Sequence, residues 1–291
     1  RTHNPILGKY ADLMESMDAP VFLPIEFFKQ YEQKCGEWDP QAIFESSGTT
    51  GQTPSRHFVK DLELYRTLAV EGFFHFWPRQ SYRILALLPS YLERGNSSLV
   101  YMVKTWIESF GLPGSGFYLR HEGALEQALF EAGDEPILLI GVAFALLDFA
   151  EQHHRKLPPH TIVMETGGMK GRKEEIIREE LHQRLREGLG VSTIASEYGM
   201  TELLSQMYAR QDGKFMAPPW VKVVISDVNL NELSVPHGRT GRINLIDLGN
   251  RDSCAFIATD DLGRMHPDGN FEVLGRIDGS ELRGCSLMYV G

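Results

Sequence analysis

The sequence predicts an α/β protein in which a doubly wound lobe with a mostly parallel sheet precedes a small β-rich C-terminal lobe. Apolar runs typical of buried strands alternate with amphipathic helical segments as far as residue 214. Beyond this point short strands follow one another between turns, with no helical pattern between them. The composition, with 42% hydrophobic and 23% charged residues, is that of an ordinary globular protein. We therefore expect an α/β core over residues 1–214 and a β-rich subdomain over residues 215–291.

The expected elements follow from hydrophobic periodicity along the chain. Residues 1–44 have an irregular helical pattern that prolines interrupt. The other predicted helices have apolar residues on one face and cover 60–76, 98–110, 122–131, 143–155 and 174–187. The predicted strands cover 82–88, 136–142, 161–165, 191–195, 221–226, 241–247, 254–258 and 270–274. Ligands of such sheets bind beyond the carboxyl ends of strands, so the loops there are the places to look for function.

Charge and composition exclude several classes of function. The net charge of -10 argues against nucleic acid as the main partner, because phosphate binding needs a basic face. The longest apolar run, residues 137–147, is far shorter than the about 20 residues that a membrane-spanning helix needs. Three scattered cysteines without a C-x-x-C pair exclude a disulfide framework and a cysteine-rich zinc site. Without a signal or transit pattern at its start, the chain is expected to be cytoplasmic.

A loop rich in serine, threonine and glycine covers residues 46–55. Its glycines allow a tight turn with exposed backbone N–H groups, and its hydroxyls supply further donors. Such a loop suits a polyphosphate, although the Walker pattern is absent; a flexible connection is the alternative. The candidate phosphate-binding residues are Ser46, Ser47, Gly48, Thr49, Thr50 and Gly51.

Two further motifs have a composition suited to a nucleotide. In Ser196–Glu202 an aromatic ring can stack on a base, a hydroxyl can meet a phosphate, and a carboxylate can hold Mg²⁺. Its alternative is a glutamate that caps a solvated helix. The segment Thr259–Arg264, followed by Asp268-Gly269 and residues 275–278, has carboxylates for ribose and an arginine for phosphate. A β-hairpin with a D-G turn and surface ion pairs is compatible with this interpretation.

In this order and at these separations, the three motifs resemble those of the adenylate-forming superfamily. That superfamily contains acyl- and aryl-CoA ligases, luciferases and the adenylation domains of peptide synthetases, and the resemblance covers about residues 40–280. It implies the fold of the superfamily's N-terminal domain, with ATP and Mg²⁺ as cofactors. It also implies that a carboxylic acid is activated as an acyl-adenylate.

The resemblance assigns roles to residues of the last two motifs. Glu202 matches the Mg²⁺ ligand, Thr201 matches the residue at the α-phosphate, and Asp261 matches the ribose-binding aspartate. Asp260 stands where the superfamily usually has glycine, which makes the local backbone uncertain because an aspartate adopts glycine's angles only at a cost. Arg276 matches an arginine that contacts ribose or phosphate. Gly167 and Gly168 match the segment against which adenine packs. Tyr198 and Gly199 belong to the adenylate-binding motif.

Long members of the superfamily carry a mobile C-terminal domain with a lysine that neutralises charge during adenylation. This chain stops 13 residues past Asp278, so we expect neither the domain nor that lysine. Lys170 could substitute for it; the alternative is a surface lysine in a basic turn. The acyl-protein synthetases of bacterial bioluminescence (LuxE-like) end in a similar way and carry a fatty acyl group on a cysteine. That resemblance indicates Cys285, with Arg283 to stabilise its thiolate; a buried cysteine in a terminal strand is the alternative.

Three functions remain open from the sequence. The first is an acid-thiol ligase that transfers a fatty acyl group to a protein cysteine, and then to a reductase or carrier protein. The second is a phenylacetate-type ligase with coenzyme A as the acceptor. The third is a protein that binds nucleotide or acyl groups without turnover. The sequence does not indicate which acid is used or the oligomeric state.

Overall fold

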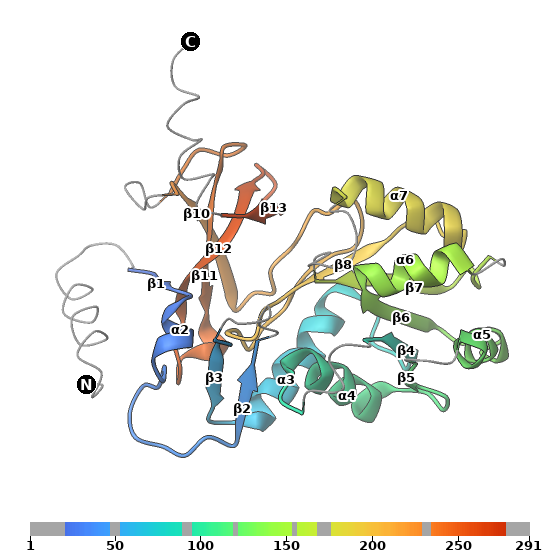
Figure 1. The fold of residues 1–291 in the computed structure, drawn as a ribbon, viewed down its shortest axis with the longest axis horizontal. Helices are drawn as coiled ribbons and strands as arrows, with labels where there is room; N and C mark the ends of the chain where they lie inside the picture. The colour runs from blue at the N-terminus through green and yellow to red at the C-terminus, as the bar shows by residue number, and fades with distance from the viewer. Residues whose placement is uncertain are drawn as a thin grey trace, which may run out of the picture. The chain divides into compact units, whose positions relative to one another are not determined.

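The computed structural model describes residues 21–46, 53–88, 95–118, 122–152, 156–167, 176–228 and 234–277. Its elements are drawn in Figure 1. The chain forms two compact units. Unit 1 comprises residues 1–62, 202–205 and 216–291, and unit 2 comprises residues 63–201 and 206–215. The predicted division between residues 214 and 215 stays a prediction, because grouping by contacts does not show which parts fold independently.

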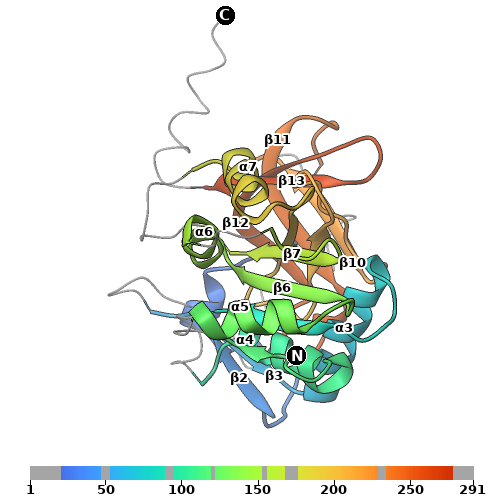
Figure 2. The ribbon, with the colours of Figure 1, turned by 90° about the vertical axis from the view of Figure 1, so that its right-hand side faces the viewer.

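Unit 2 is built on a six-stranded sheet with the order β5-β4-β6-β7-β8-β9. All neighbours in this sheet are parallel except β8 and β9, which are antiparallel. The strands are β4 (Arg83–Leu87), β5 (Gly116–Phe117), β6 (Ile137–Val142), β7 (Thr161–Thr166), β8 (Ala195–Tyr198) and β9 (Met207–Ala209). The helices are α3 (Leu62–Phe76), α4 (Ser98–Phe110), α5 (Glu122–Glu131), α6 (Ala143–Gln152) and α7 (Arg178–Leu189). Figure 2 shows β6, β7 and the helices α3 to α7 from a second direction.

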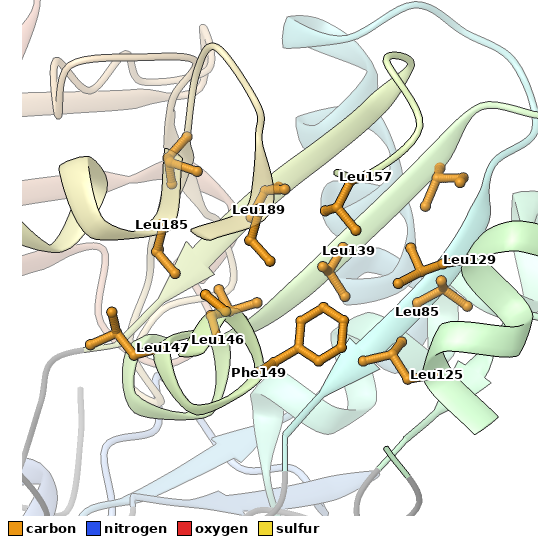
Figure 3. Close-up of a cluster of buried hydrophobic side chains, with 14 of the residues drawn as sticks. Leu85, Leu125, Leu129, Leu139, Leu146, Leu147, Phe149, Leu157, Leu185 and Leu189 are labelled. Carbon is orange, nitrogen blue, oxygen red and sulfur yellow. The ribbon is translucent and has the colours of Figure 1, made fainter. Parts of the chain in front are cut away.

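Helices α5, α6 and α7 pack on one side of this sheet through a core of aliphatic side chains (Figure 3). Leu85 and Leu139 from the strands belong to the same cluster as Leu129 of α5, Leu146 of α6 and Leu185 of α7, and all five are almost completely buried. A second core lies around α3 and α4, where the rings of Phe73, Trp77, Tyr82, Trp106 and Phe110 contact one another. Strand β6 is buried at every position, as expected for a central parallel strand covered on both faces.

Unit 1 contains a five-stranded sheet with the order β1-β12-β11-β10, in which β13 also pairs with β12. The strands are β1 (Leu23–Pro24), β10 (Val221–Ser226), β11 (Thr240–Asp247), β12 (Phe256–Met265) and β13 (Phe271–Arg276). Strand β1 is parallel to β12 and the other pairs are antiparallel. A separate hairpin pairs β2 (Ala42–Glu45) with β3 (Arg56–Val59). The short α2 (Phe27–Gln30) and the 3-10 turn η1 (Leu248–Asn250) complete the unit.

The predicted α/β class, with a parallel sheet and a β-rich C-terminal region, is confirmed. The predicted helices over 98–110 and 122–131 have the bounds of α4 and α5. The helical interpretation of residues 1–44 is wrong in its described part, which holds β1, β2 and only one turn of helix, α2. Helix α7 begins at Arg178, not at residue 174.

Two motifs that we expected in loops lie partly in strands. Strand β8 covers residues 195–198 instead of the predicted 191–195, so the motif Ser196–Glu202 begins inside the sheet. Thr259–Arg264 lies within β12, and Arg276 ends β13. Polar and charged residues in both segments gave no apolar strand pattern. In β12 the charge of Asp260 is compensated by Arg242, which is distant in the sequence. The predicted D-G turn at residues 268–269 does connect β12 to β13.

Candidate active site

The predicted site residues fall into three groups. Ser46, Glu202, Asp261 and Arg276 are described in unit 1, and Gly167, Tyr198, Gly199 and Thr201 in unit 2. Outside the described residues lie Ser47, Gly48, Thr49, Thr50, Gly51, Gly168, Lys170 and Cys285. The roles implied for all of them stay predictions, and the geometry below concerns the described residues.

Asp247 holds the backbone around Glu202 in place. This buried carboxylate at the end of β11 accepts hydrogen bonds from the backbone N–H groups of Leu204 and Ser205, each at 3.1 Å, and of Gly249 at 3.0 Å. The hydroxyl of Ser205 donates a further bond of 2.8 Å. Burial raises the pKa of Asp247, and these donors act in the opposite direction. Segment 202–205 is therefore fixed to the sheet of unit 1 through one side chain.

Asn250 provides a second support for Glu202. Its amide nitrogen donates to the backbone carbonyl of Glu202 at 2.7 Å. Its amide oxygen lies 2.9 Å from Nε2 of the buried His57 on β3. Because the nitrogen of Asn250 is the donor, the oxygen accepts, and His57 carries its proton on Nε2 in this arrangement. The ring of His57 meets the edge of the Phe28 ring in α2, with centroids 5.8 Å apart.

The Glu202 carboxyl is buried next to polar and positively charged groups of unit 1. Burial raises its pKa, while a hydrogen bond from the Ser55 hydroxyl and the charges of Arg276 and Lys29 favour the ionised form. Ser55 is itself buried and terminates the hydroxyl-rich loop. The Ser46 N–H donates to the Ser55 carbonyl at 3.0 Å, and the Ser55 N–H donates to Ser46 Oγ at 2.9 Å. The two ends of the predicted phosphate loop are thus joined, and one of them touches Glu202.

Asp261 and Arg276 face each other across β12 and β13. Arg276 Nε lies 3.6 Å from Asp261 Oδ1, and Arg276 Nη2 lies 3.9 Å from Asp260 Oδ2. Asp260 is also 3.6 Å from Arg242 Nη1. Burial, followed by the neighbouring Glu26, raises the pKa of Asp260 to about 6 against the effect of both arginines. Asp260 is not among the residues with positive φ, so its strand conformation needs no glycine.

The groups in unit 1 fit a magnesium nucleotide. No cluster of three or more metal-ligating side chains occurs among the described residues. Mg²⁺ does not need such a cluster, because it is commonly held by one or two carboxylates together with substrate phosphates and water. Glu202 and Ser55 would supply a carboxylate and a hydroxyl for the metal, while the Asp261 carboxylate has the chemistry that ribose hydroxyls require.

The described residues of the predicted adenine site lie at the carboxyl ends of β7 and β8 in unit 2. Gly167 follows β7 with φ of 69°, and no described atom lies within 4 Å of where a side chain would begin. Tyr198 ends β8 and packs against Phe215 with ring centroids 5.8 Å apart. A Cβ at Gly199 would clash with Glu197 Oε1, so a larger residue here requires the Glu197 carboxyl to move.

Two buried glutamates in unit 2 have opposite pKa shifts. Burial would raise the pKa of Glu165, but hydrogen bonds from His182 and Ser196 and the charge of Arg178 outweigh it and lower the pKa. His182 Nε2 and Arg178 Nε lie 3.4 and 3.3 Å from Glu165 Oε1. Burial, together with the charge of Glu165, raises the pKa of Glu197 to about 7 despite a hydrogen bond from Thr166. Glu165 is therefore the more acidic member of the pair, and Glu197 is protonated below about pH 7.

The surroundings of Glu197 include polar atoms that lack a partner. Tyr208 is directly opposite Glu197 in the β8–β9 ladder. Its buried hydroxyl and the amide oxygen of Gln206 have no hydrogen-bond partner among the described residues. The amide of Gln206 hydrogen-bonds the hydroxyl of Tyr65 on α3. Glu197 is thus surrounded by uncharged hydrogen-bonding groups as well as by Glu165.

Comparison with known proteins identifies the family. The model of the family described as "Acyl-protein synthetase, LuxE" matches residues 120–290, more than half of the chain. The chain belongs to this acyl-protein synthetase family. The matched part of this LuxE-family protein includes Glu202, Asp261, Arg276 and Cys285. No curated protein matches the sequence.

Solved structures of adenylate-forming enzymes share the fold of this LuxE-family chain. ATP-bound MatB from Rhodopseudomonas palustris has a TM-score of 0.56 and 18% identity, over 83% of this chain and 49% of MatB. The luciferase-like enzyme of the mealworm Zophobas morio has a TM-score of 0.58 and 16% identity, over 91% and 61% of the two chains. The o-succinylbenzoate CoA synthetase MenE from Bacillus subtilis has a TM-score of 0.58 and 17% identity, over 82% of this chain and 50% of MenE. This chain therefore spans about half the length of MatB and of MenE.

The sequence alone did not indicate several residues that shape these sites. Asp247 is the last residue of the predicted strand 241–247 and Asn250 lies three residues beyond it. Because ligands bind at the carboxyl ends of strands, these positions could have been considered as site residues. Glu197 precedes the predicted Tyr198, but nothing local shows that its carboxyl is buried. No sequence pattern indicated Lys29, because the two-residue β1 that positions its segment cannot be recognised in a sequence.

In the described part of the chain, no helix has the length and apolar character needed to cross a membrane.

Proposed function

We propose that this chain activates a carboxylic acid with MgATP as an acyl-adenylate and transfers the acyl group to a protein cysteine thiol. The observation that carries this proposal is the assembly of the Glu202 carboxylate, the base of the Ser46–Ser55 loop and Arg276 in one unit. Three motifs that are far apart in the sequence thus supply groups to one place. Membership of the acyl-protein synthetase family supports the acyl transfer.

In the first step of the proposed reaction, a carboxylate oxygen of the substrate attacks the α-phosphorus of ATP. A new P–O bond forms, the bond to the β-phosphate bridging oxygen breaks, and pyrophosphate leaves. All reacting groups are anionic, so the protein has mainly to position them and to compensate their charge. Glu202 and Ser55 would hold Mg²⁺, which supplies positive charge to the phosphates when bound. Asp261 would orient the ribose.

In the second step a thiolate attacks the acyl carbon, the bond to AMP breaks, and a thioester forms. Two of the three cysteines are poor nucleophiles. Burial, followed by the charge of Asp252, raises the pKa of Cys35, and burial raises the pKa of Cys254 to about 12. A thiol whose pKa is raised contains little of the thiolate that reacts. The resemblance to acyl-protein synthetases suggests Cys285 as the acceptor and a fatty acid as the source of the acyl group.

The test is acyl transfer followed by mass spectrometry of the intact protein. The full chain is incubated with ATP, Mg²⁺ and a panel of fatty and aromatic acids, with and without coenzyme A. We expect one acyl mass that hydroxylamine removes and that Cys285→Ala abolishes, while Cys35→Ala retains it. Formation of acyl-CoA with no labelled protein would replace the proposal by a CoA ligase. ATP binding with neither product would indicate a protein that binds without turnover.

A further inference from the structure

The N-terminal segment around α2 contributes charged groups to the Glu202 site, although no sequence motif marks it. Strand β1 lies parallel to β12, and the N–H of Ile25 donates to the carbonyl of Ala258 at 3.0 Å. This pairing brings Glu26 next to Asp260, with which it shares a hydrogen bond. Lys29 follows Glu26 by three residues, which places the two on the same side of the helical turn.

The position of Lys29 is fixed by its neighbour Phe28. The fully buried ring of Phe28 packs on His57, which hydrogen-bonds Asn250, which in turn holds the backbone carbonyl of Glu202. The helical turn and Glu202 therefore share one support within unit 1. Lys29 itself is only half-buried, and its ammonium is near enough to Glu202 to favour the ionised carboxylate.

Lys29 differs from the other cations around this site because none of the described acidic residues lies close to it. Arg276 lies within 4 Å of Asp260 and Asp261, and Arg242 within 4 Å of Asp260. On the same segment, Lys34 pairs with Glu32 and lies over the ring of Trp38. Among the described residues, no acidic group lies within 4 Å of the Lys29 ammonium. Its charge is therefore available to an anion that binds beside Glu202.

We propose that Lys29 binds the phosphates of ATP and supplies positive charge to them during adenylation. This inference rests on the proposed function and specifies a catalytic residue for it. A polyphosphate and a substrate carboxylate bring several negative charges to one place, where Glu202, Asp260 and Asp261 are already present. A compact ammonium that is not committed to a carboxylate is suited to such a ligand, and its stabilising effect grows where water is excluded.

The test compares Lys29→Ala and Lys29→Arg with the wild type and with Lys34→Ala as a matched lysine control. Binding of the non-reacting analogue α,β-methylene-ATP and of adenosine is measured by calorimetry with Mg²⁺ present. ATP–pyrophosphate exchange is measured separately. Lys29→Ala should weaken analogue binding about 10-fold, leave adenosine binding unchanged and slow exchange about 100-fold, as for loss of one charge-stabilising group. Lys29→Arg should recover part of both losses, and Lys34→Ala should behave as the wild type.

The outcomes separate this inference from the proposed function. If the wild type exchanges pyrophosphate and Lys29→Ala does so equally well, the role of Lys29 is wrong and the proposed function stands. If the wild type binds the analogue through Lys29 but never exchanges, the lysine is a phosphate ligand and the proposed function is wrong. Equal loss of adenosine and analogue binding would indicate structural damage and would also reject the role. Lys29→Met, which retains most of the apolar stem, replaces Lys29→Ala if that variant fails to fold.

Discussion

Glu197 and Glu202 are five residues apart in one motif, yet their carboxyl groups are surrounded by opposite kinds of neighbour. Both are buried, Glu197 in unit 2 and Glu202 in unit 1. Burial raises the pKa of Glu202 as well, but a hydroxyl donor and two cations, Lys29 and Arg276, act in the opposite direction. Glu197 has a hydroxyl donor and the negative charge of Glu165, and its pKa is raised to about 7. Burial alone therefore does not decide the role of these two glutamates. The charges of the neighbouring groups decide it.

The difference predicts different roles for the two side chains. A carboxylate with cations and a hydroxyl beside it can exchange these partners for a metal ion and phosphates. A carboxyl that keeps its proton can donate a hydrogen bond to a neutral group instead. Gln206 and Tyr208 near Glu197 have buried polar atoms without partners in the described part of the chain, which fits the second role. Three changes would sharpen or break this contrast.

The largest expected effect on stability is at the support of Glu202. Asp247→Asn replaces one of two acceptor oxygens by an amide that faces the N–H groups of Leu204, Ser205 or Gly249. Leaving buried donors unpaired costs several kcal/mol, and we expect a loss of about 3 kcal/mol in the free energy of unfolding, measured with urea. Asp252→Asn, which loses only a partly exposed pair with Lys60, should cost less than about 0.5 kcal/mol. Equal effects of the two changes would show that Asp247 is not the support we describe.

A smaller effect on stability is expected from the titration of Glu197. The carboxyl has a pKa near 4.5 when unfolded and about 7 when folded, so between these values the folded state binds more protons. Stability should therefore fall as pH rises through this window, by about 1.4 kcal/mol per pH unit from this group. Glu197→Gln cannot titrate and should remove that part of the slope between pH 5 and 7 in urea unfolding. Parallel pH profiles for wild type and variant would show that Glu197 is ionised throughout and would end the contrast with Glu202.

The smallest effect is expected at Gly199. Its substitution by alanine puts a methyl group 2.4 Å from Glu197 Oε1, so the carboxyl or the strand end has to move. We expect Gly199→Ala to cost about 1–2 kcal/mol of unfolding free energy. At Gly123 no described atom lies within 4 Å of an added methyl group, so Gly123→Ala should leave the free energy of unfolding unchanged or raise it slightly. In a Glu197→Ala background the cost at Gly199 should shrink, because the obstructing carboxyl is absent. An unchanged cost would mean that the backbone, not Glu197, requires glycine.

The sequence predicted most of the regular helices and central strands because their apolar residues repeat with a clear period. Strand β6 and helix α4 are examples in which burial and local pattern agree. The prediction failed where polar residues are buried by partners far away in the chain. Thr259–Arg264 looks like a loop until Arg242 and Arg276 are brought beside Asp260.

Candidate site residues were predictable only where a motif carries them. The motifs indicated Glu202, Asp261 and Arg276 because residue types and spacing resemble a known superfamily. Supports such as Asp247, Asn250 and His57 act through hydrogen bonds to residues far away in the sequence, and such bonds give no periodic pattern. Lys29 depends on a two-residue strand pairing that joins residues more than 200 positions apart, and no local pattern encodes such a pairing.

The central claim is that Glu202 serves an adenylation reaction, and ATP–pyrophosphate exchange tests it most directly. The full chain is given MgATP, labelled pyrophosphate and a panel of carboxylic acids, beside Glu202→Gln and the control Glu272→Gln, whose carboxylate pairs with Arg264. We predict acid-dependent exchange that Glu272→Gln retains and that Glu202→Gln loses by about three orders of magnitude, with a melting temperature close to that of the wild type. Exchange that survives in Glu202→Gln, or a wild type that exchanges with none of the acids while it binds ATP, would contradict this account.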